Sequence, residues 1–357
     1  MAQTPPELSH LIETIMYARN AGKFLNIVGG GTKCFYGEEQ CGEPCDVRRL
    51  SGICSYEPSE LVITARAGTP VEEIEAVLAK HNQYLAFEPP RFASGSTVGG
   101  VVAAGLSGPA RVGGGSIRDF VLGATMINGK GELLTFGGQV MKNVAGYDVS
   151  RLLAGSMGIL GVICEVSLKV LPIHSSRITL VVDRDEEAAL SFLIGLARQA
   201  LPVNASAWHD GKVFVRLSGA PSAVEEARKR LGGTVLEPGE ALAWWDAVRD
   251  HRHAFFTRSD APLWRISVPA VAQPMKAANQ FIEWGGALRW LYTDDSIVEV
   301  RETASALGGH ATLFRDPHRR SGVFTPPRGA LLEVHRNLKH AFDPDGIFNV
   351  GRLYPGL

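Results

Sequence analysis

The segment PPRFASGSTVGGVVAAGLSGPARVGGGSIRDFVLG, residues 89–123, contains nine of the chain's 40 glycines. A disordered linker would not place glycines inside the apolar run VGGVVAAGL, residues 98–106, because that run has to be buried. Backbone that lies against a large planar or diphosphate ligand accounts for both features, since amides supply polar contacts and small residues permit close approach. The segment therefore favours the wall of a ligand site over a hinge or linker.

A second glycine-rich stretch comes earlier, in LNIVGGGTKCFYG, residues 25–37. A short predicted strand leads into three glycines, a threonine and a lysine. Their spacing matches neither the Walker loop nor the dinucleotide-binding G-x-G-x-x-G pattern. Successive amides without neighbouring Cβ atoms can converge on a diphosphate, and the lysine adds charge at the rim. A tight turn between a strand and a loop is the alternative interpretation.

Composition narrows the class of protein. The chain has 357 residues, enough for about two domains, and a net charge of -1 with no basic block, which argues against nucleic-acid binding. The N-terminal MAQTPPELSH lacks the basic and apolar segments of a signal peptide, and no run approaches the ~20 apolar residues of a membrane span. We therefore expect a cytoplasmic protein without an integral membrane segment.

The five cysteines do not form a recognisable metal motif. Cys34, Cys41 and Cys45 lie close together, but no histidine or C-x2-C pair accompanies them. We expect reduced, structural thiols and no metal, so an iron–sulfur centre that exchanges electrons with this protein would belong to another chain.

Helix and strand patterns surround the glycine-rich stretches. Residues 4–22 predict an amphipathic helix, and residues 61–65 predict a strand followed by a helix with Thr69 as its N-cap. Residues 120–136 predict a β-hairpin that turns at Asn-Gly or at the following Lys-Gly, and residues 161–172 alternate strictly between apolar and polar side chains before a proline.

Beyond residue 176 the glycine density falls and strands alternate with helices. The predicted strands are 177–182, 212–217, 263–269, 287–293 and 311–314, and the predicted helices are 186–200, 222–231, 277–284 and 297–307. This order indicates an antiparallel sheet covered by helices on one face. A last amphipathic helix has Leu331, Val334, Leu338 and Phe342 on one side.

Four segments together point to a known family. VGGGTK, STVGG, GYDVSRLLAGSMGILGVICEV and the tail LKHAFDPDGIFNVGRL resemble, in this order, the FAD-binding proteins of the vanillyl-alcohol oxidase or p-cresol methylhydroxylase (PCMH) type. The common form of the tail has Pro at Val350 and Lys at Arg352. The resemblance covers essentially the whole chain. It implies an α+β fold: a PCMH-type FAD-binding domain of two α+β subdomains over 1–172, an α+β cap domain with an antiparallel sheet over 173–325, and a C-terminal helix and tail, 326–357, that pack back on the FAD-binding domain.

A narrower resemblance concerns CEVSLKVLP, WGGALRWL, GGHATLFR and EPPR, which are similar to segments of the FAD-binding E subunits of bacterial three-subunit glycolate oxidases. It implies oxidation of glycolate, a small 2-hydroxy acid, to glyoxylate. It also implies a sister FAD-binding subunit and an iron–sulfur subunit as partners, and peripheral association of the complex with the inner face of the cell membrane.

The family resemblance assigns cofactor-binding residues one by one. Those for the FAD pyrophosphate are Gly29, Gly30, Gly31, Thr32 and Lys33. Those that line the cofactor are Pro89, Ser96, Thr97, Val98, Gly99, Gly100, Ser107 and Gly108. Those near the adenine or flavin are Gly161, Val162 and Ile163, with Lys142, Asn349 and Arg352 also close to the flavin. Relatives that bind FAD covalently use a His in the first loop, and its absence here implies non-covalent FAD.

Oxidation of a 2-hydroxy acid needs a base and a cation for the carboxylate. The metal-associated His-x-Gly-Asp-Gly-Asn-like motif of related D-lactate and glycolate oxidising subunits is absent from this sequence. His310 is a candidate base or a structural histidine. Arg265 and Arg289, each beside a tryptophan, are candidate carboxylate ligands, with stacking on the indole as the alternative. LFRDPHRRSG, residues 313–322, is a solvated loop or a docking surface.

Three functions remain open at this stage. The chain's FAD either oxidises the substrate or relays electrons while the sister subunit performs the oxidation. A stand-alone FAD oxidoreductase with another substrate in the cap is the second possibility, and a scaffold subunit without cofactor is the third.

Overall fold

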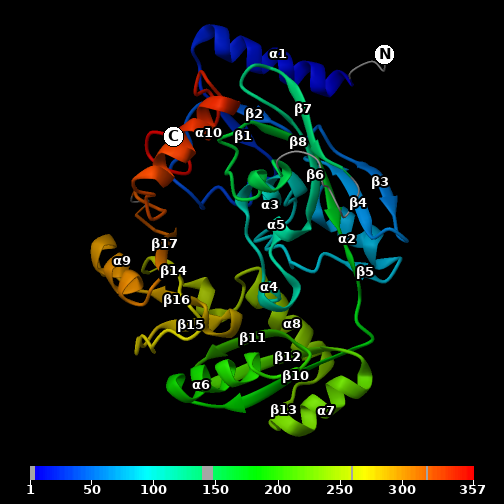
Figure 1. Cartoon of the computed structure of the whole chain (residues 1–357), viewed down its shortest axis with the longest axis vertical. Coiled ribbons are helices and arrows are strands. Elements are labelled where there is room, and N and C mark those ends of the chain that lie inside the picture. The colour runs from blue at the N-terminus through cyan, green and yellow to red at the C-terminus, as the bar shows by residue number, and fades with distance from the viewer. Residues whose placement is uncertain (1–4, 139–147, 259, 319–320) are drawn as a thin grey trace.

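The structure is a computed structural model that describes residues 5–138, 148–258, 260–318 and 321–357. Two sheets dominate it, one of five strands and one of eight. Figure 1 shows the five-stranded sheet and the N-terminal helix in the upper half and the eight-stranded sheet in the lower half. The chain descends once, between β9 and β10, and its C-terminal segment returns to the upper half.

The N-terminal unit pairs two short parallel strands, β1 (Leu25–Val28) and β2 (Glu43–Asp46), beneath α1 (Pro6–Ala21). As predicted, α1 presents an apolar face and ends at Gly22, whose φ of 62° lies in the left-handed region. Its buried residues pack with β1, β2 and the C-terminal tail in one cluster.

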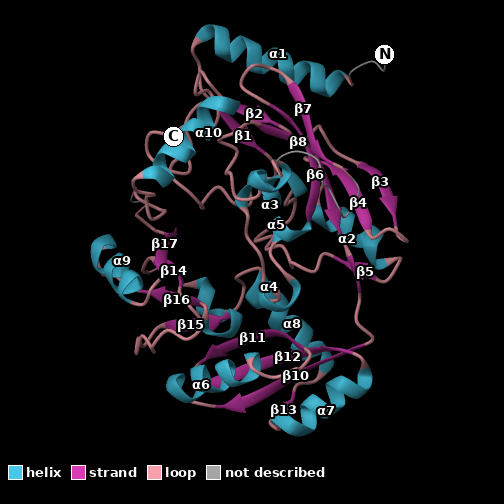
Figure 2. Cartoon of the chain, viewed as in Figure 1, coloured by secondary structure: helices cyan, strands magenta, loops and turns pink. Residues whose placement is uncertain are grey.

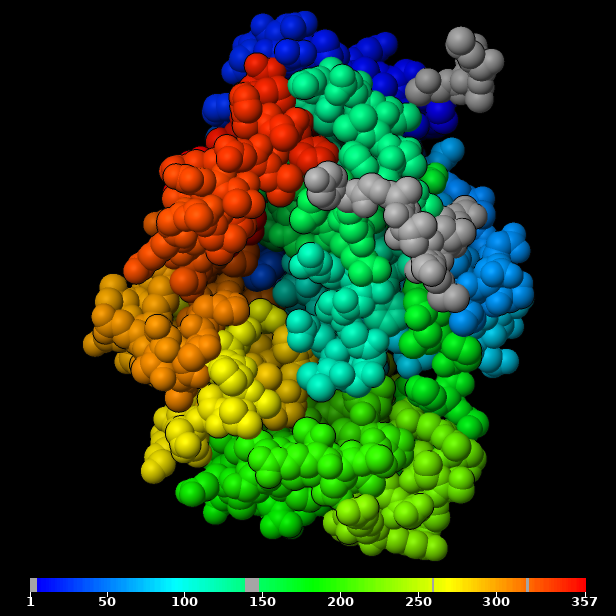
Figure 3. All heavy atoms as spheres, viewed as in Figure 1, coloured from blue at the N-terminus to red at the C-terminus, as the bar shows by residue number. Residues whose placement is uncertain are grey.

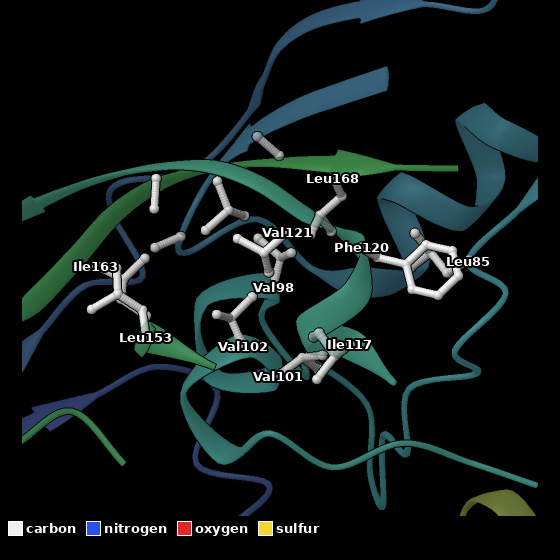
Figure 4. Packing of buried hydrophobic residues seen from close by; sticks show 14 of the residues in the cluster. Leu85, Val98, Val101, Val102, Ile117, Phe120, Val121, Leu153, Ile163 and Leu168 are labelled. Carbon is white, nitrogen blue, oxygen red and sulfur yellow. The ribbon is translucent and has the colours of Figure 1, made fainter. Parts of the chain in front are cut away.

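The five-stranded sheet is antiparallel and has the order β3-β4-β8-β6-β7. Its strands are β3 (Ile53–Glu57), β4 (Val62–Arg66), β8 (Val162–Lys169), β6 (Val121–Ile127) and β7 (Leu133–Gly137). Helices α2 (Val71–Ala79), α3 (Val98–Ala104) and α5 (Ile117–Phe120) pack against it, while α4 (Arg111–Gly114) precedes α5 and the two-residue strands β5 (Gln83–Tyr84) and β9 (Leu171–Pro172) pair with each other. Figure 4 shows valines of α3 beside side chains of the sheet and of α5.

The hairpin and the alternating strand predicted for this half are confirmed. The β6–β7 turn is held by Asn128, whose Oδ1 accepts hydrogen bonds from the backbone N–H of Lys130 and Glu132. The predicted role of Thr69 is wrong. Helix α2 begins at Val71, and Thr69 Oγ1 instead donates to the Arg66 carbonyl and accepts from the Gly52 amide.

The eight-stranded sheet has the order β13-β10-β12-β11-β15-β16-β14-β17 and is antiparallel. Its strands are β10 (Ser176–Asp183), β11 (Val203–His209), β12 (Lys212–Gly219), β13 (Thr234–Val235), β14 (Leu263–Ser267), β15 (Gln280–Glu283), β16 (Leu288–Tyr292) and β17 (His310–Arg315). Helices α6 (Glu186–Ala197), α7 (Pro221–Leu231) and α9 (Ile297–Ala306) cover its outer face, and α8 (Pro238–Arg249) packs on the inner face, which is turned to the upper half. Figure 2 shows this arrangement.

Two predictions for this half are wrong. The helix predicted over 277–284 is strand β15, followed by the short 3-10 turn η3 (Trp284–Gly286). All four residues of β15 are buried between β11 and β16, including the polar Gln280 and Glu283, so the polar positions of the sequence do not mark an exposed face. Helices also lie on both faces of the sheet, because α8 fills the gap beneath the upper half.

The C-terminal helix α10 (Ala330–Phe342) leads the chain back to β1, where Leu25 forms a parallel bridge with Phe348. Only the second half of its predicted apolar stripe packs on the protein, since Leu331 and Val334 are exposed. In the described residues, no helix combines the length and the apolar character that a membrane span requires.

A buried ion pair fastens this tail. Lys339 Nζ donates to an Asp343 carboxylate oxygen at 2.6 Å and to the carbonyls of Ile159 and Phe348. The Asp343 carboxylate also accepts from the amides of Ile347 and Phe348. The pair therefore joins α10, the tail and the turn before β8.

We expect Asp343→Asn to lower the free energy of unfolding by about 3–5 kcal/mol, because it leaves a buried ammonium group without its counter-ion. The matched control is Asp345→Asn, which removes the exposed pair with Arg19 and should cost less than about 1 kcal/mol. Urea unfolding followed by circular dichroism measures both. Equal effects of the two variants would show that the buried pair does not fasten the tail.

Candidate functional site

The loop that follows β1 presents hydrogen-bond donors without acceptors. Within the described part of the chain, the backbone N–H groups of residues 29–33 make no hydrogen bond to protein atoms. Consecutive backbone amides without protein partners are able to bind an anion. The loop is also a turn, with hydrogen bonds from the Cys34 amide to the Gly31 carbonyl and from the Tyr36 amide to the Lys33 carbonyl, so its geometry fits both interpretations.

The glycines of this loop are required by its neighbours. A Cβ on Gly30 would overlap the Gly95 carbonyl oxygen, and one on Gly29 would lie 2.5 Å from Thr97 Oγ1. Gly31 has a φ of 71°, which side chains disfavour. The first loop is thus pressed against the start of α3, and the two glycine-rich stretches form one surface.

Lys33 lies at the edge of this surface. Its Nζ donates to Ser96 Oγ at 2.7 Å and to Thr32 Oγ1 at 3.3 Å, and among the described residues it forms no ion pair. Burial lowers the pKa of Lys33 to about 8. Lys33 is therefore a cation without a counter-ion, next to the free amides.

Two residues of the C-terminal tail hold the loop in place. Asn349 accepts a hydrogen bond from the Ile27 amide at 2.8 Å and donates one to the Met157 carbonyl at 2.7 Å. It therefore links β1 to the turn before β8. The Arg352 guanidinium donates to the carbonyls of Cys34, Tyr36 and Glu38. Sequence reasoning placed both residues near the cofactor without assigning this structural role.

A pocket, which we call the loop pocket, opens between these segments. The predicted site residues that line it are Gly29, Gly30, Gly31, Thr32, Lys33, Thr97, Gly99, Gly100, Gly161, Ile163, Asn349 and Arg352. Lining residues that sequence reasoning missed include Gln40, Ala67 and Ala103. Figure 3 shows a hollow between the C-terminal segment, in orange and red, and the green segments, with blue atoms of the N-terminal part at its floor.

Other predicted residues lie elsewhere. Val98 and Val162 are buried in the core, Val98 beside the sheet as Figure 4 shows. Ser96 contacts the loop pocket through Lys33, and Pro89 lines no pocket described here. Lys142 lies outside the described residues.

Ser107 and Gly108 line a second, smaller space, the inner cavity, between residues 90–109 and the inner face of the eight-stranded sheet. Ser107 Oγ accepts from the Ile117 amide, and the Gly108 carbonyl accepts from Trp284 Nε1. Phe92 lines the inner cavity and lies 5.6 Å from Lys33 Nζ. The inner cavity therefore adjoins the loop pocket.

Arg265 of β14 faces this inner cavity. Its guanidinium lies 5.1 Å from the Trp284 ring and makes no hydrogen bond or ion pair within the described chain. Burial lowers the pKa of Arg265, and the nearby Tyr36 and Glu283 oppose that shift. The Arg265 guanidinium lies near an indole ring and still has no hydrogen-bonded partner within the described residues. Stacking and carboxylate binding, the two interpretations of Arg265, are therefore compatible.

Two further titratable groups line the inner cavity. Burial raises the pKa of Glu283 to about 7, against a hydrogen bond of 2.7 Å from Trp290 Nε1. Burial, together with Arg315 and Arg265, lowers the pKa of His251 well below its ordinary value, and its Nδ1 has no partner. This shift keeps His251 neutral and makes it a weak base, so its free ring nitrogen suits a hydrogen bond from a hydroxyl group. Sequence reasoning missed His251, because it lies in a charged stretch, DHRHAF, without a recognisable motif.

Arg289 and His310 are not in this cavity. Arg289 lies on the outer face of β16, where it donates to the carbonyls of Gly286, Ala272 and Gln273. This geometry does not support Arg289 as a carboxylate ligand. His310 lies exposed at the start of β17 and lines no pocket described here.

The remaining candidates give no metal site. The described residues contain no cluster of three or more His, Cys, Asp or Glu side chains placed to bind a metal ion. All five cysteines are free thiols. The loop 313–322 contributes Arg315, Asp316 and Pro317 to a cavity beside the first loop, so it is not simply a solvated surface loop.

The fold and the loop pocket define a class of protein. Residues 3–137 match a family model described as an FAD binding domain. Solved structures of alkyldihydroxyacetonephosphate synthase share the fold, with a TM-score of 0.65 at 14% identity over 96% of this chain and 75% of that one. The protein is an FAD-binding flavoprotein of the PCMH type, which confirms the predicted fold class and cofactor.

A closer relative specifies the family. Glycolate oxidase subunit GlcE of Escherichia coli (strain K12) is 42% identical over 348 residues, 97% of each chain. The chain belongs to the GlcE family of FAD-linked oxidoreductases. A D-lactate dehydrogenase of Anaerostipes hadrus is 31% identical over 40% of this chain and 29% of its own length. Glycolate oxidase subunit GlcD of Bacillus subtilis (strain 168) is 29% identical over 41% and 32%.

We expect the affinity for FAD to fall roughly tenfold between pH 7 and pH 9.5, because the pyrophosphate favours protonated Lys33 and the free protein loses that proton above about pH 8. Lys33→Met should bind FAD more weakly at pH 7 and lose this pH dependence. Lys23→Met, at an exposed lysine, is the matched control. Flavin fluorescence titrations measure the dissociation constants. A Lys33→Met protein that retains the wild-type pH profile would contradict this role.

Proposed function

We propose that this chain is the FAD-binding subunit of a glycolate oxidase complex. Within that complex glycolate is oxidised to glyoxylate, and electrons pass through flavin to an iron–sulfur partner subunit. The observation that carries the proposal is the similarity to GlcE, which extends over 97% of both chains. A sister FAD-binding subunit completes the complex, and the site of action is the cytoplasm or the inner face of the cell membrane.

The cofactor would be held without a covalent bond. The free amides of residues 29–33 and Lys33 suit the pyrophosphate, and no histidine is present in that loop to form a covalent link. Backbone near Thr97, Gly99 and Gly100 forms the opposite wall of the loop pocket.

The domain limits 1–172, 173–325 and 326–357 are part of the same proposal: the first domain would hold FAD and the second domain would cover it. FAD supplies a two-electron acceptor.

One observation favours substrate oxidation on this chain over an electron relay. Arg265 is a half-buried cation in the inner cavity that makes no hydrogen bond or ion pair within the described residues, and a free guanidinium suits a small carboxylate. His251, neutral and with a free Nδ1 in the same cavity, would accept a hydrogen bond from the substrate hydroxyl. In the relay alternative, neither residue meets the substrate and the sister subunit performs the oxidation.

We expect the chain to co-purify with a second flavoprotein and an iron–sulfur protein, and the complex to be reduced by glycolate under anaerobic conditions. Flavin counting and absorbance spectra measure both. A stand-alone oxidoreductase would instead be reduced without partners by a metabolite that is not a 2-hydroxy acid. A scaffold subunit would release no flavin on denaturation. Either result would refute the proposal.

A substitution separates the oxidation and relay versions. In the complex, Arg265→Gln should raise KM for glycolate at least about tenfold if Arg265 binds the carboxylate, since it removes a charge-assisted pair. Arg265→Lys should restore part of the loss. Arg252→Gln, at an exposed arginine, is the matched control. An unchanged KM and kcat in Arg265→Gln, at unchanged FAD content, would assign the oxidation to the sister subunit.

A further inference from the structure

A cavity of about 570 Å³ lies apart from the loop pocket, between the upper half and the inner face of the eight-stranded sheet. Its upper wall comes from α2 and β5, and its lower wall from β10, β13 and α8. Figure 1 shows these elements around the segment that descends from β9 to β10. We call this space the lateral cavity. Its volume is in the range of ligand pockets, about 300–1,000 Å³.

The walls of the lateral cavity are mainly apolar. They include Ile173, Val235 and Leu242, whose exposed fractions are 47%, 41% and 59%. These three come from three separate elements and meet in one cavity, whereas single exposed apolar side chains are ordinary. Trp245 adds an aromatic surface, and its Nε1 is occupied by Thr179 Oγ1. The cavity thus offers continuous apolar area to a ligand.

The acidic groups of the lateral cavity are each paired with an arginine. Glu75 pairs with Arg91 at 3.1 Å, and Asp246 pairs with Arg249 at 3.1 Å. Glu88 accepts from Arg216 at 2.7 Å. None of these carboxylates is left to attract a cation.

Arg177 differs from the other charged groups. Its guanidinium lies 5.9 Å from the Tyr84 ring, and within the described residues it makes no hydrogen bond and no ion pair. Arg177 is exposed, and the charge of the nearby Arg216 is compensated by its pair with Glu88. A free guanidinium beside an apolar wall is suited to the planar head of a carboxylate that carries an apolar chain.

We propose that the lateral cavity binds a small amphipathic carboxylate, with its head on Arg177 and its apolar chain along Ile173, Val235 and Leu242. The loop pocket and the lateral cavity share no lining residue, so the site is separate from the candidate cofactor site, and with the inner cavity it shares Arg249 alone among the described lining residues. The ligand contacts both halves of the protein beside the connecting segment. Its binding therefore stabilises the two halves against each other.

Octanoate is a suitable probe, with acetate as the ligand without a chain and octanol as the ligand without a charge. Isothermal titration of the full-length, FAD-loaded protein should show saturable binding of octanoate at one site and none of acetate. We expect Arg177→Gln to weaken octanoate binding at least about tenfold. The matched control is Arg184→Gln, at an exposed arginine that lies over Phe192 on the other side of the sheet.

The apolar half of the site has its own test. Leu242→Asn changes a side chain that is already exposed, so the fold is retained, and we expect weaker binding of octanoate. Leu331→Asn, at an exposed leucine of α10, should leave it unchanged. Absence of saturable binding, equal binding of octanol and octanoate, or equal affinities of the Arg177→Gln and Arg184→Gln proteins would each overturn the proposal.

Discussion

The shape of the first loop depends on a guanidinium group of the C-terminal tail. Buried carbonyl groups need hydrogen-bond donors, and the turn that follows residues 29–33 obtains them from a residue distant in the sequence. Here the Arg352 guanidinium takes the carbonyls of Cys34, Tyr36 and Glu38 from behind, while the amides of residues 29–33 stay open. Arg352 itself is fixed in the tail that the Lys339–Asp343 pair fastens. The shape of the candidate cofactor site therefore depends on a segment more than 300 positions away.

Much of this arrangement could be predicted from the sequence. The glycine-rich loops, the hairpin and the alternating strand β8 are local patterns, and the order of four segments indicated the family. The pattern could not show why the glycines are needed. Gly30 lies against the Gly95 carbonyl and Gly99 against Ala67, so close approach between protein segments accounts for part of an excess that sequence reasoning attributed to a ligand. Close contact with a ligand and close contact with another protein segment both require glycine, so the sequence alone does not distinguish them.

The two candidate arginines show why the inner cavity was harder to predict. Arg265 follows a tryptophan in LWRIS, and Arg289 precedes one in LRWLY, so the two strands carry the pair in opposite order. In the register of the sheet Arg265 is opposite Trp290, and Arg289 is opposite Ile266. Cross-strand partners share a face, so Arg265 points inward with Trp290 while Arg289 points outward. Without the register, the two arginines were equivalent. Strand β15 was not predicted because its polar residues Gln280 and Glu283 are buried with the apolar ones. Helix α8, which also shapes the cavity, was missed although its buried residues Ala241, Trp245 and Val248 have helical spacing.

The last common feature of these sites is how the protein compensates its buried positive charges. A buried cation is unfavourable unless an anion or hydrogen-bond acceptors compensate it, and most charged groups of this protein's interior obey that rule. Arg289 and Arg352 are satisfied by carbonyls, and Lys339 by Asp343. Lys33 bonds two hydroxyl oxygens but no carboxylate, and Arg265 makes no hydrogen bond within the described residues. Phe92 lines the cavity of Arg265 and lies 5.6 Å from Lys33 Nζ, so the two cations lie on either side of it. A pyrophosphate beside Lys33 and a carboxylate beside Arg265 would compensate these two positive charges. The energetic cost of an uncompensated cation therefore indicates where ligands would bind.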